Sequence, residues 1–150
     1  MRIQLLLSLL LSTNSTLMGA QIIGSCPPIP PRNPRDVKEL SGVVVDQDMA
    51  VIPKVKVLLQ VRDGEKFRDV AAVDTDSTGR FNFESQPRGG YRFVFSGPAG
   101  FCPAKIPVRY TSEGLHGMRL ILPVAASDTC PQYCEGRLKV EEMTGREGRE

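Results

Sequence analysis

Four cysteines and one histidine are the residues in this chain that could most readily support chemistry. A zinc site has weak support, because Cys130 and Cys134 have three residues between them, no second pair follows, and His116 is the single histidine. A redox-active pair would favour two intervening residues. We therefore expect structural disulfides in place of a metal or redox site. Cys102 is expected to pair with Cys130 or Cys134. Cys26 is a further candidate.

The acidic residues suggest a second kind of site, a calcium loop. Asp74, Asp76 and Thr78 place oxygen atoms at alternate positions, and Gly79 follows them, as in the first half of such a loop. The bidentate glutamate of the twelfth position is missing, because Ser85 stands there. We therefore interpret Asp74, Asp76 and Gly79 as the turn of a β-hairpin, and we expect no metal and no cofactor.

Catalysis has little support in the sequence. His116 falls in a predicted strand, and no nucleophile motif lies near it. A glycosidase needs only two carboxylates, and Asp46 and Asp74 are a pair that folding could bring together. We predict that the protein is not an enzyme.

Alternating apolar and polar residues predict short strands through the middle of the chain. Turn-forming residues separate these strands, and no helical period of any length is present. The predicted fold class is therefore all-β, a Greek-key sandwich of seven or eight antiparallel strands over residues 38–123. The expected strands are 40–46, 54–62, 67–73, 80–83, 91–95, 104–110 and 115–122.

The same alternation predicts which side chains form the core. In the first expected strand, Val43 and Val45 should face inward together, with Val44 on the other side. The other expected core residues are Val55, Val57, Leu59, Phe81, Phe93, Val108 and Leu120.

The first residues have the three-part layout of a secretory signal. Arg2 supplies the positive charge, an apolar run covers 3–11, and small or polar residues follow over 12–20. A run of nine residues is too short to cross a bilayer, which needs roughly twenty. We expect a signal peptide over 1–20 and an exported protein in the periplasm, at the cell surface or outside the cell.

An alternative interpretation of this region is a lipoprotein signal. Ile23-Gly24-Ser25-Cys26 resembles a bacterial lipobox, which would end the signal at residue 25 and attach a lipid to Cys26. A polar stretch between the apolar run and Cys26 argues against this alternative, as does the even number of cysteines. Contact with a membrane is expected only through the signal segment or such an anchor.

The segments on either side of the predicted sandwich differ from it in composition. Residues 21–37 are rich in proline and should form a polyproline II spacer. Residues 124–150 form an extension with two cysteines and a charged tail that is expected to fray. The net charge of +2 is small and the basic residues are dispersed, so nucleic acid is not an expected partner.

Five segments follow one another along the chain in a recognisable order: Gly42-Val43-Val44-Val45-Asp46, Ala50 to Pro53, Val55 to Leu59, Thr75 to Phe81, and Gly90-Tyr91. The order of these motifs resembles the carboxypeptidase regulatory-like domain, a transthyretin-like β-sandwich related to carbohydrate-binding-like folds. No zinc-ligand motif of the neighbouring peptidase domain is present in this chain.

The resemblance implies an accessory module. We therefore expect a non-catalytic exported module that binds a cell-envelope protein or a glycan. The alternatives are a structural spacer or self-association module that uses an exposed edge strand, and, more distantly, a hydrolase with an unrecognised site.

Overall fold

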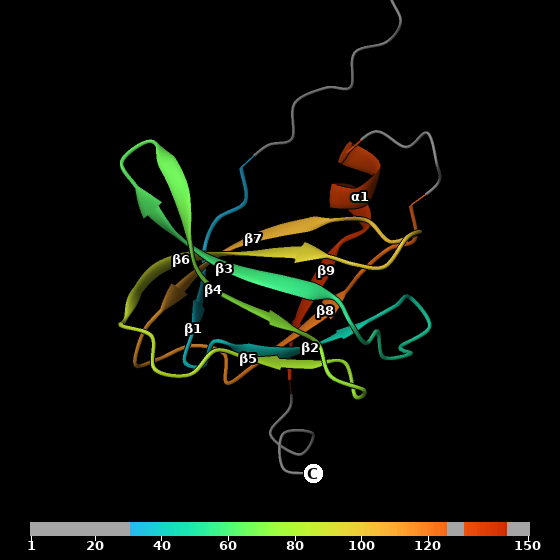
Figure 1. Cartoon of the computed structure of the whole chain (residues 1–150), viewed down its shortest axis with the longest axis horizontal. Coiled ribbons are helices and arrows are strands. Elements are labelled where there is room, and N and C mark those ends of the chain that lie inside the picture. Colours follow the sequence, from blue (N-terminus) through green and yellow to red (C-terminus); the bar gives the residue numbers. More distant parts are fainter. Residues whose placement is uncertain (1–30, 126–130, 144–150) are drawn as a thin grey trace, which may run out of the picture.

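The computed structural model describes residues 31–125 and 131–143. Within these residues, nine strands and one short helix form two sheets packed face to face (Figure 1). The five-stranded sheet has the order β1-β7-β6-β3-β4, and the four-stranded sheet has the order β5-β2-β8-β9. The elements are β1 (Arg35–Val37), β2 (Ser41–Val45), β3 (Lys56–Asp63), β4 (Lys66–Asp74), β5 (Arg80–Asn82), β6 (Gly89–Ser96), β7 (Ala104–Tyr110), β8 (Met118–Ile121), α1 (Pro131–Arg137) and β9 (Lys139–Glu142).

The predicted all-β sandwich is confirmed, but its strand number and strand directions need correction. The sheets are mixed, because β1 pairs with β7 in parallel and β2 pairs with β8 in parallel. The two strands that the sequence did not indicate, β1 and β9, lie outside 38–123 in the expected spacer and extension. Each contains a single apolar residue, Val37 or Val140, so neither shows the alternation that predicts a strand.

The turn after β4 is not the hairpin that the sequence suggested. β4 belongs to the five-stranded sheet and β5 to the four-stranded sheet, so this connection carries the chain from one sheet to the other. The turn chemistry itself is as expected: Asp76 Oδ1 accepts hydrogen bonds from the backbone of Thr78 at 2.8 Å and of Arg80 at 3.0 Å. A local turn signal fixes the reversal, but not the strand that the chain pairs with afterwards.

Thr75 attaches the end of β4 to the segment before β3. Its hydroxyl donates to the Ile52 carbonyl oxygen at 2.8 Å and accepts from the Val55 backbone N–H at 2.9 Å. Thr75 is only 3% exposed. Because both hydrogen bonds of the Thr75 hydroxyl are made inside the protein, they stabilise the crossing between the sheets.

The core lies between the two sheets and confirms most of the predicted positions. Four aromatic rings meet at its centre, and Phe81 makes edge contacts with Phe93 and Phe95 at centroid distances of 5.5 Å and 5.4 Å. The confirmed members of this core are Val55, Val57, Leu59, Phe81, Phe93, Val108 and Leu120.

The orientation predicted for the first long strand was wrong. Val44 faces the main core, whereas Val43 and Val45 are buried with Ile121 in a small cluster apart from it. In the parallel pairing of β2 with β8, Val45 lies beside Ile121, so the outer face of the sheet also carries apolar contacts. Three successive valines contain no alternation, and the inward face could not be read from them.

A disulfide joins Cys102, just before β7, to Cys134 in α1. Of the two partners that the sequence left open for Cys102, the structure shows Cys134. Cys26 and Cys130 lie outside the described residues, as do the expected signal peptide and residues 144–150, so those expectations stay predictions. Among the described helices, none has the length and apolar character needed to span a membrane.

Candidate functional site

The single histidine does not form a catalytic group with its neighbours. His116 is exposed in the bend before β8, not in the strand as predicted, and its Nδ1 lies 3.8 Å from Glu39 Oε1. Ser41 donates its hydroxyl proton to the other oxygen of the same carboxylate at 3.2 Å. The carboxylate thus stands between serine and histidine, whereas activation of a serine requires the histidine in the middle position.

The structure also leaves the two candidate carboxylates apart. Asp46 Oδ1 accepts hydrogen bonds from the backbone N–H groups of Asp48 and Ala50, at 2.9 Å and 2.8 Å, so it stabilises the turn after β2. Asp74 ends β4 in the other sheet, opposite Lys56. Asp46 is thus committed to its own turn, and no contact between the two carboxylates is seen in the described structure.

The central turn uses its oxygen atoms for its own structure. Asp76 Oδ1 also accepts the Thr78 hydroxyl at 2.7 Å, and this bond, followed by the backbone N–H of Arg80, lowers the pKa of the Asp76 carboxyl. Gly79 has a φ of 73°, which the turn requires. The described residues contain no cluster of three or more His, Cys, Asp or Glu side chains able to hold a metal ion.

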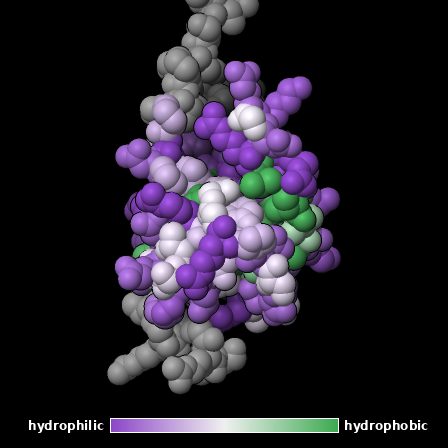
Figure 2. Space-filling model, turned by 90° about the vertical axis from the view of Figure 1, so that its left-hand side faces the viewer, coloured by the Kyte–Doolittle hydropathy of each residue, from purple (hydrophilic) through white to green (hydrophobic). Residues whose placement is uncertain are grey.

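Exposed aromatic rings would favour binding of a glycan, but two of those on the described surface are covered by arginine. The Arg92 guanidinium lies 3.4 Å from the ring centroid of Phe67, and the Arg137 guanidinium lies 4.3 Å from that of Tyr133. Gln60 accepts two further hydrogen bonds from Arg92, at 2.6 Å and 2.9 Å. Hydrophilic side chains also predominate on the face in Figure 2, with hydrophobic ones gathered along one side. These rings are therefore occupied within the chain.

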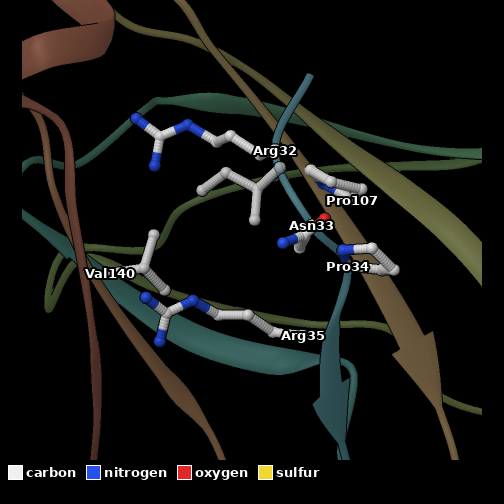
Figure 3. A pocket seen from close by; sticks show the side chains of 7 residues that line it. Arg32, Asn33, Pro34, Arg35, Pro107 and Val140 are labelled. Carbon is white, nitrogen blue, oxygen red and sulfur yellow. The ribbon is translucent and has the colours of Figure 1, made fainter. Parts of the chain in front are cut away.

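A cavity of about 330 Å³ lies where the first strand of one sheet approaches the last strand of the other (Figure 3). β1 is the edge of the five-stranded sheet beside β7, and β9 is the edge of the four-stranded sheet. The volume of the cavity falls at the lower end of the range for small-molecule sites. The lining residues are Arg32, Asn33, Pro34, Arg35, Ile106, Pro107 and Val140.

Arg32 is fixed on one side of the cavity by the C-terminal helix. Its Nε donates to Glu135 Oε2 at 2.6 Å, and its Nη2 donates to the Glu135 backbone oxygen at 2.7 Å. The two side chains are 30% and 18% exposed, so this ion pair is partly shielded from water. The disulfide at Cys134 holds the same helix against the start of β7. Arg32 is therefore oriented by a helix that is itself covalently fastened.

Arg35 occupies the other side and has different surroundings. It lies beside the buried Val108 in the parallel register of β1 and β7, so its side chain leaves the strand on the inner face. Figure 3 shows the side chains of Arg32 and Arg35 extending in the same direction on opposite sides of the pocket, with Val140 at the space between their guanidinium groups. Within the described part of the chain, no hydrogen bond or ion pair engages Arg35. Arg35 is exposed, and none of its five N–H donors is used within the described residues.

The lining can bind an anion but offers little for proton transfer. The two guanidinium groups and the Asn33 amide supply polar contacts, and Ile106 and Val140 supply apolar walls. No histidine, cysteine or carboxylate belongs to the described lining. Recognition of an anion is the property that this geometry supports.

Sequence reasoning missed this site because its parts were assigned to segments without structure. Arg32 and Arg35 stand in the proline-rich stretch interpreted as a spacer, and Glu135 stands in the extension. Two arginines among prolines were the available signal. Their relation to Glu135 spans 103 positions and has no local trace in the sequence.

No protein-family model matches the chain, and no curated protein matches it. Two solved structures resemble it in fold. The 5-hydroxyisourate hydrolase of Klebsiella pneumoniae is 16% identical with a TM-score of 0.47, over 75% of this chain and 100% of the hydrolase chain. An (S)-allantoin synthase is 13% identical with a TM-score of 0.44, over 75% of this chain and 45% of the synthase chain.

Both proteins have transthyretin-like folds, which is the fold class predicted from the sequence. They do not support the carboxypeptidase regulatory-like assignment. Likeness at such identities concerns the fold alone, and TM-scores this low carry no argument about the chemistry of this chain.

The prediction of a non-catalytic module that binds a cell-envelope protein or a glycan is not retained: the two solved structures are named as a hydrolase and a synthase, and neither is named as an accessory or binding module. The neighbours establish no activity for this chain either, since the fold is shared with non-enzymes.

Proposed function

We propose that this protein binds a small organic anion in the cavity between β1, β7 and β9. The observation that carries the proposal is the guanidinium of Arg35, which faces this cavity and has no partner among the described residues. A second arginine, Arg32, lines the same space. A planar guanidinium fork matches a carboxylate with two parallel hydrogen bonds, and charge-assisted bonds of this kind are the strong ones.

The walls of the cavity favour an organic anion over a simple hydrated ion. Ile106 and Val140 are apolar, and Pro34 and Pro107 add their ring carbons. An apolar body placed against these walls gains roughly 25 cal/mol for each Å² removed from water. A small ion leaves the apolar walls in contact with water, so it gains only the electrostatic attraction to the arginines.

The unpartnered guanidinium of Arg35 has one other explanation, which the test must distinguish from ligand binding. A charge that points inward from an edge strand discourages another chain from pairing with that edge. In that case, replacing Arg35 would change self-association and leave ligand binding untouched. The proposal predicts the reverse.

The test is calorimetric titration with benzoate as the probe. Arg35→Gln should weaken binding by about 10- to 100-fold, because a charge-assisted hydrogen bond contributes about 1.5–3 kcal/mol. Arg68→Gln is the matched control, since Arg68 is an exposed arginine on β4, at the opposite edge of the same sheet. Binding that survives Arg35→Gln, or wild-type protein that takes up no organic anion, would refute the proposal.

Turnover is tested with the same preparations. The hydrolase neighbour is named for 5-hydroxyisourate, so this compound is the first substrate to assay. The likeness in fold gives no reason of its own to expect turnover. Hydrolysis that Arg35→Gln abolishes and Arg68→Gln preserves would extend the proposed function from binding to catalysis.

We also propose that the protein works outside the cytoplasm. The layout of residues 1–20 is that of an export signal, and the Cys102–Cys134 disulfide is compatible with an oxidising compartment. Mass spectrometry of the mature protein tests both predicted forms. Cleavage after Ala20 gives an unmodified start at Gln21, whereas a lipoprotein starts at a lipid-bearing Cys26. An intact N-terminus in the mature protein would contradict export by this signal.

A further inference from the structure

We infer that the ligand carries a single negative charge on an apolar body, as a monocarboxylate does, and that Glu135 determines this preference. The inference rests on the proposed function and names its ligand class. It follows from three properties of the cavity: its net charge, its free hydrogen-bond donors and the composition of its walls.

The net charge of the site is one positive charge. Arg32 and Glu135 form an ion pair at 2.6 Å and cancel each other, which leaves the charge of Arg35. Lys139 and Glu141, the chain neighbours of Val140, leave β9 on the opposite face because successive side chains alternate. They carry opposite charges, and Glu141 lies 3.8 Å from Arg119. Counted over the lining residues and their ion-pair partners, one anionic group therefore neutralises the site.

The free donors also fit one carboxylate. Arg35 retains all five N–H groups, enough for a bidentate contact with two carboxylate oxygens. Arg32 has already committed its Nε and one N–H of Nη2 to Glu135. Its other three N–H groups can still support the same ligand, but its charge is already compensated by Glu135.

The walls disfavour a second charge. A ligand that contacts both the Arg35 guanidinium and the apolar wall places its remaining atoms against Ile106 and Val140. A second carboxylate in that position would lose water without gaining a partner, and an uncompensated charge is costly in apolar surroundings. Glu135 strengthens this effect, because it compensates the charge of Arg32 and so leaves no second uncompensated cation for a second carboxylate.

The experiment compares two ligands that share one ring, benzoate with one carboxylate and isophthalate with two. Full-length wild-type protein is titrated with each, and the ratio of the two dissociation constants is the readout. We expect benzoate to bind more tightly. In Glu135→Gln, which keeps an oxygen acceptor for Arg32 but removes the charge, the ratio should shift toward isophthalate by about tenfold, the scale of one charge removed near the ligand.

Two further variants complete the test. Glu65→Gln is the control, because Glu65 is an exposed residue in the turn between β3 and β4, at the far edge of the five-stranded sheet, and its replacement should leave the ratio unchanged. Arg32→Gln changes the site in the opposite direction, since it removes a positive charge from the lining and leaves Glu135 without its ion-pair partner. Both ligands should then bind more weakly, and isophthalate should lose more than benzoate. This second variant decides the question if Glu135→Gln proves unstable.

The outcomes separate this inference from the proposed function. Failure of the wild-type protein to bind either ligand would overturn both. Binding of both ligands with equal affinity, or a ratio that Glu135→Gln and Arg32→Gln leave unchanged, would overturn the charge preference and leave anion binding intact. A shift in the ratio that the Glu65→Gln control reproduces would also overturn it, since the effect would then arise from the overall charge of the protein.

Discussion

Arg32 is bonded twice to Glu135, a residue 103 positions further along the chain. Nε donates to the side chain at 2.6 Å and Nη2 to the backbone oxygen at 2.7 Å, so the contact fixes both the charge and the direction of the guanidinium. It connects the segment that leads into β1, which lines the cavity, with α1. The geometry of the candidate site therefore depends on α1 remaining against the sheets.

Removal of the Cys102–Cys134 disulfide should weaken both the fold and the site. The bond closes a loop over a sequence separation of 32, for which the chain-entropy model gives roughly 3–4 kcal/mol. Without it, α1 is less firmly placed and Glu135 no longer orients Arg32. We expect the double variant Cys102→Ala/Cys134→Ala to unfold at lower urea concentration and to bind benzoate more weakly. If the double variant is folded and binds benzoate as the wild type does, then α1 does not need the disulfide to orient Arg32.

Gly42→Ala should strongly destabilise the sandwich. A Cβ at this position would lie 2.2 Å from the Met118 carbonyl oxygen and 2.9 Å from the ring of Phe81, so β8 or the aromatic cluster must move. Overpacking of this kind costs about 1–3 kcal/mol or more. Gly90→Ala, in β6, is the control because a Cβ there meets no atom within 4 Å. Urea denaturation measures both variants, and equal stabilities would contradict the packing seen around Gly42.

Thr75→Val should destabilise the crossing between the sheets. Valine has nearly the same shape but leaves the Ile52 carbonyl oxygen and the Val55 N–H without the hydroxyl. An unsatisfied buried polar group costs about 1–3 kcal/mol. Thr75→Ser keeps the hydroxyl and should recover much of this loss. A valine variant more stable than the serine variant in urea would show that the methyl group, and not the hydrogen bonds, is what matters at this position.

Asp76 should contribute to the loss of stability in acid. Hydrogen bonds from Thr78 and from the backbone of Arg80 lower the pKa of its carboxyl below the usual 3.8. The stabilisation is therefore complete above 3.8 and is lost as the pH falls through the lower folded-state pKa. Asp76→Asn removes this titration, so its stability should change less between neutral and acidic pH than that of the wild type.

The control for the acid experiment is Asp48→Asn, because the Asp48 carboxylate makes no hydrogen bond in the described structure. The free energy of unfolding of Asp48→Asn should change with pH in the same way as that of the wild type. Identical pH profiles for Asp76→Asn and the wild type would mean that the turn does not need the ionised carboxylate.

Local patterns were sufficient for most of the fold. Residues 54–62 alternate strictly, and β3 was found over nearly the same span, Lys56–Asp63. The strand expected at 104–110 was found at the same bounds. Alternation failed at Val43, Val44 and Val45, where both faces of the strand are apolar and the burial of each face depends on neighbouring strands.

The sequence by itself determined the all-β class, the positions of the turns and most core residues, because alternation and turn chemistry are local properties of the chain. Only the tertiary structure decided that Asp76 lies on a crossing between sheets, that Cys102 pairs with Cys134, that Arg32 and Arg35 line one cavity, and that Glu135 pairs with Arg32. Each of these relations arises from pairing between strands or helices far apart in the sequence. Such pairing is selected by the packing of whole sheets, and no short stretch of residues specifies it.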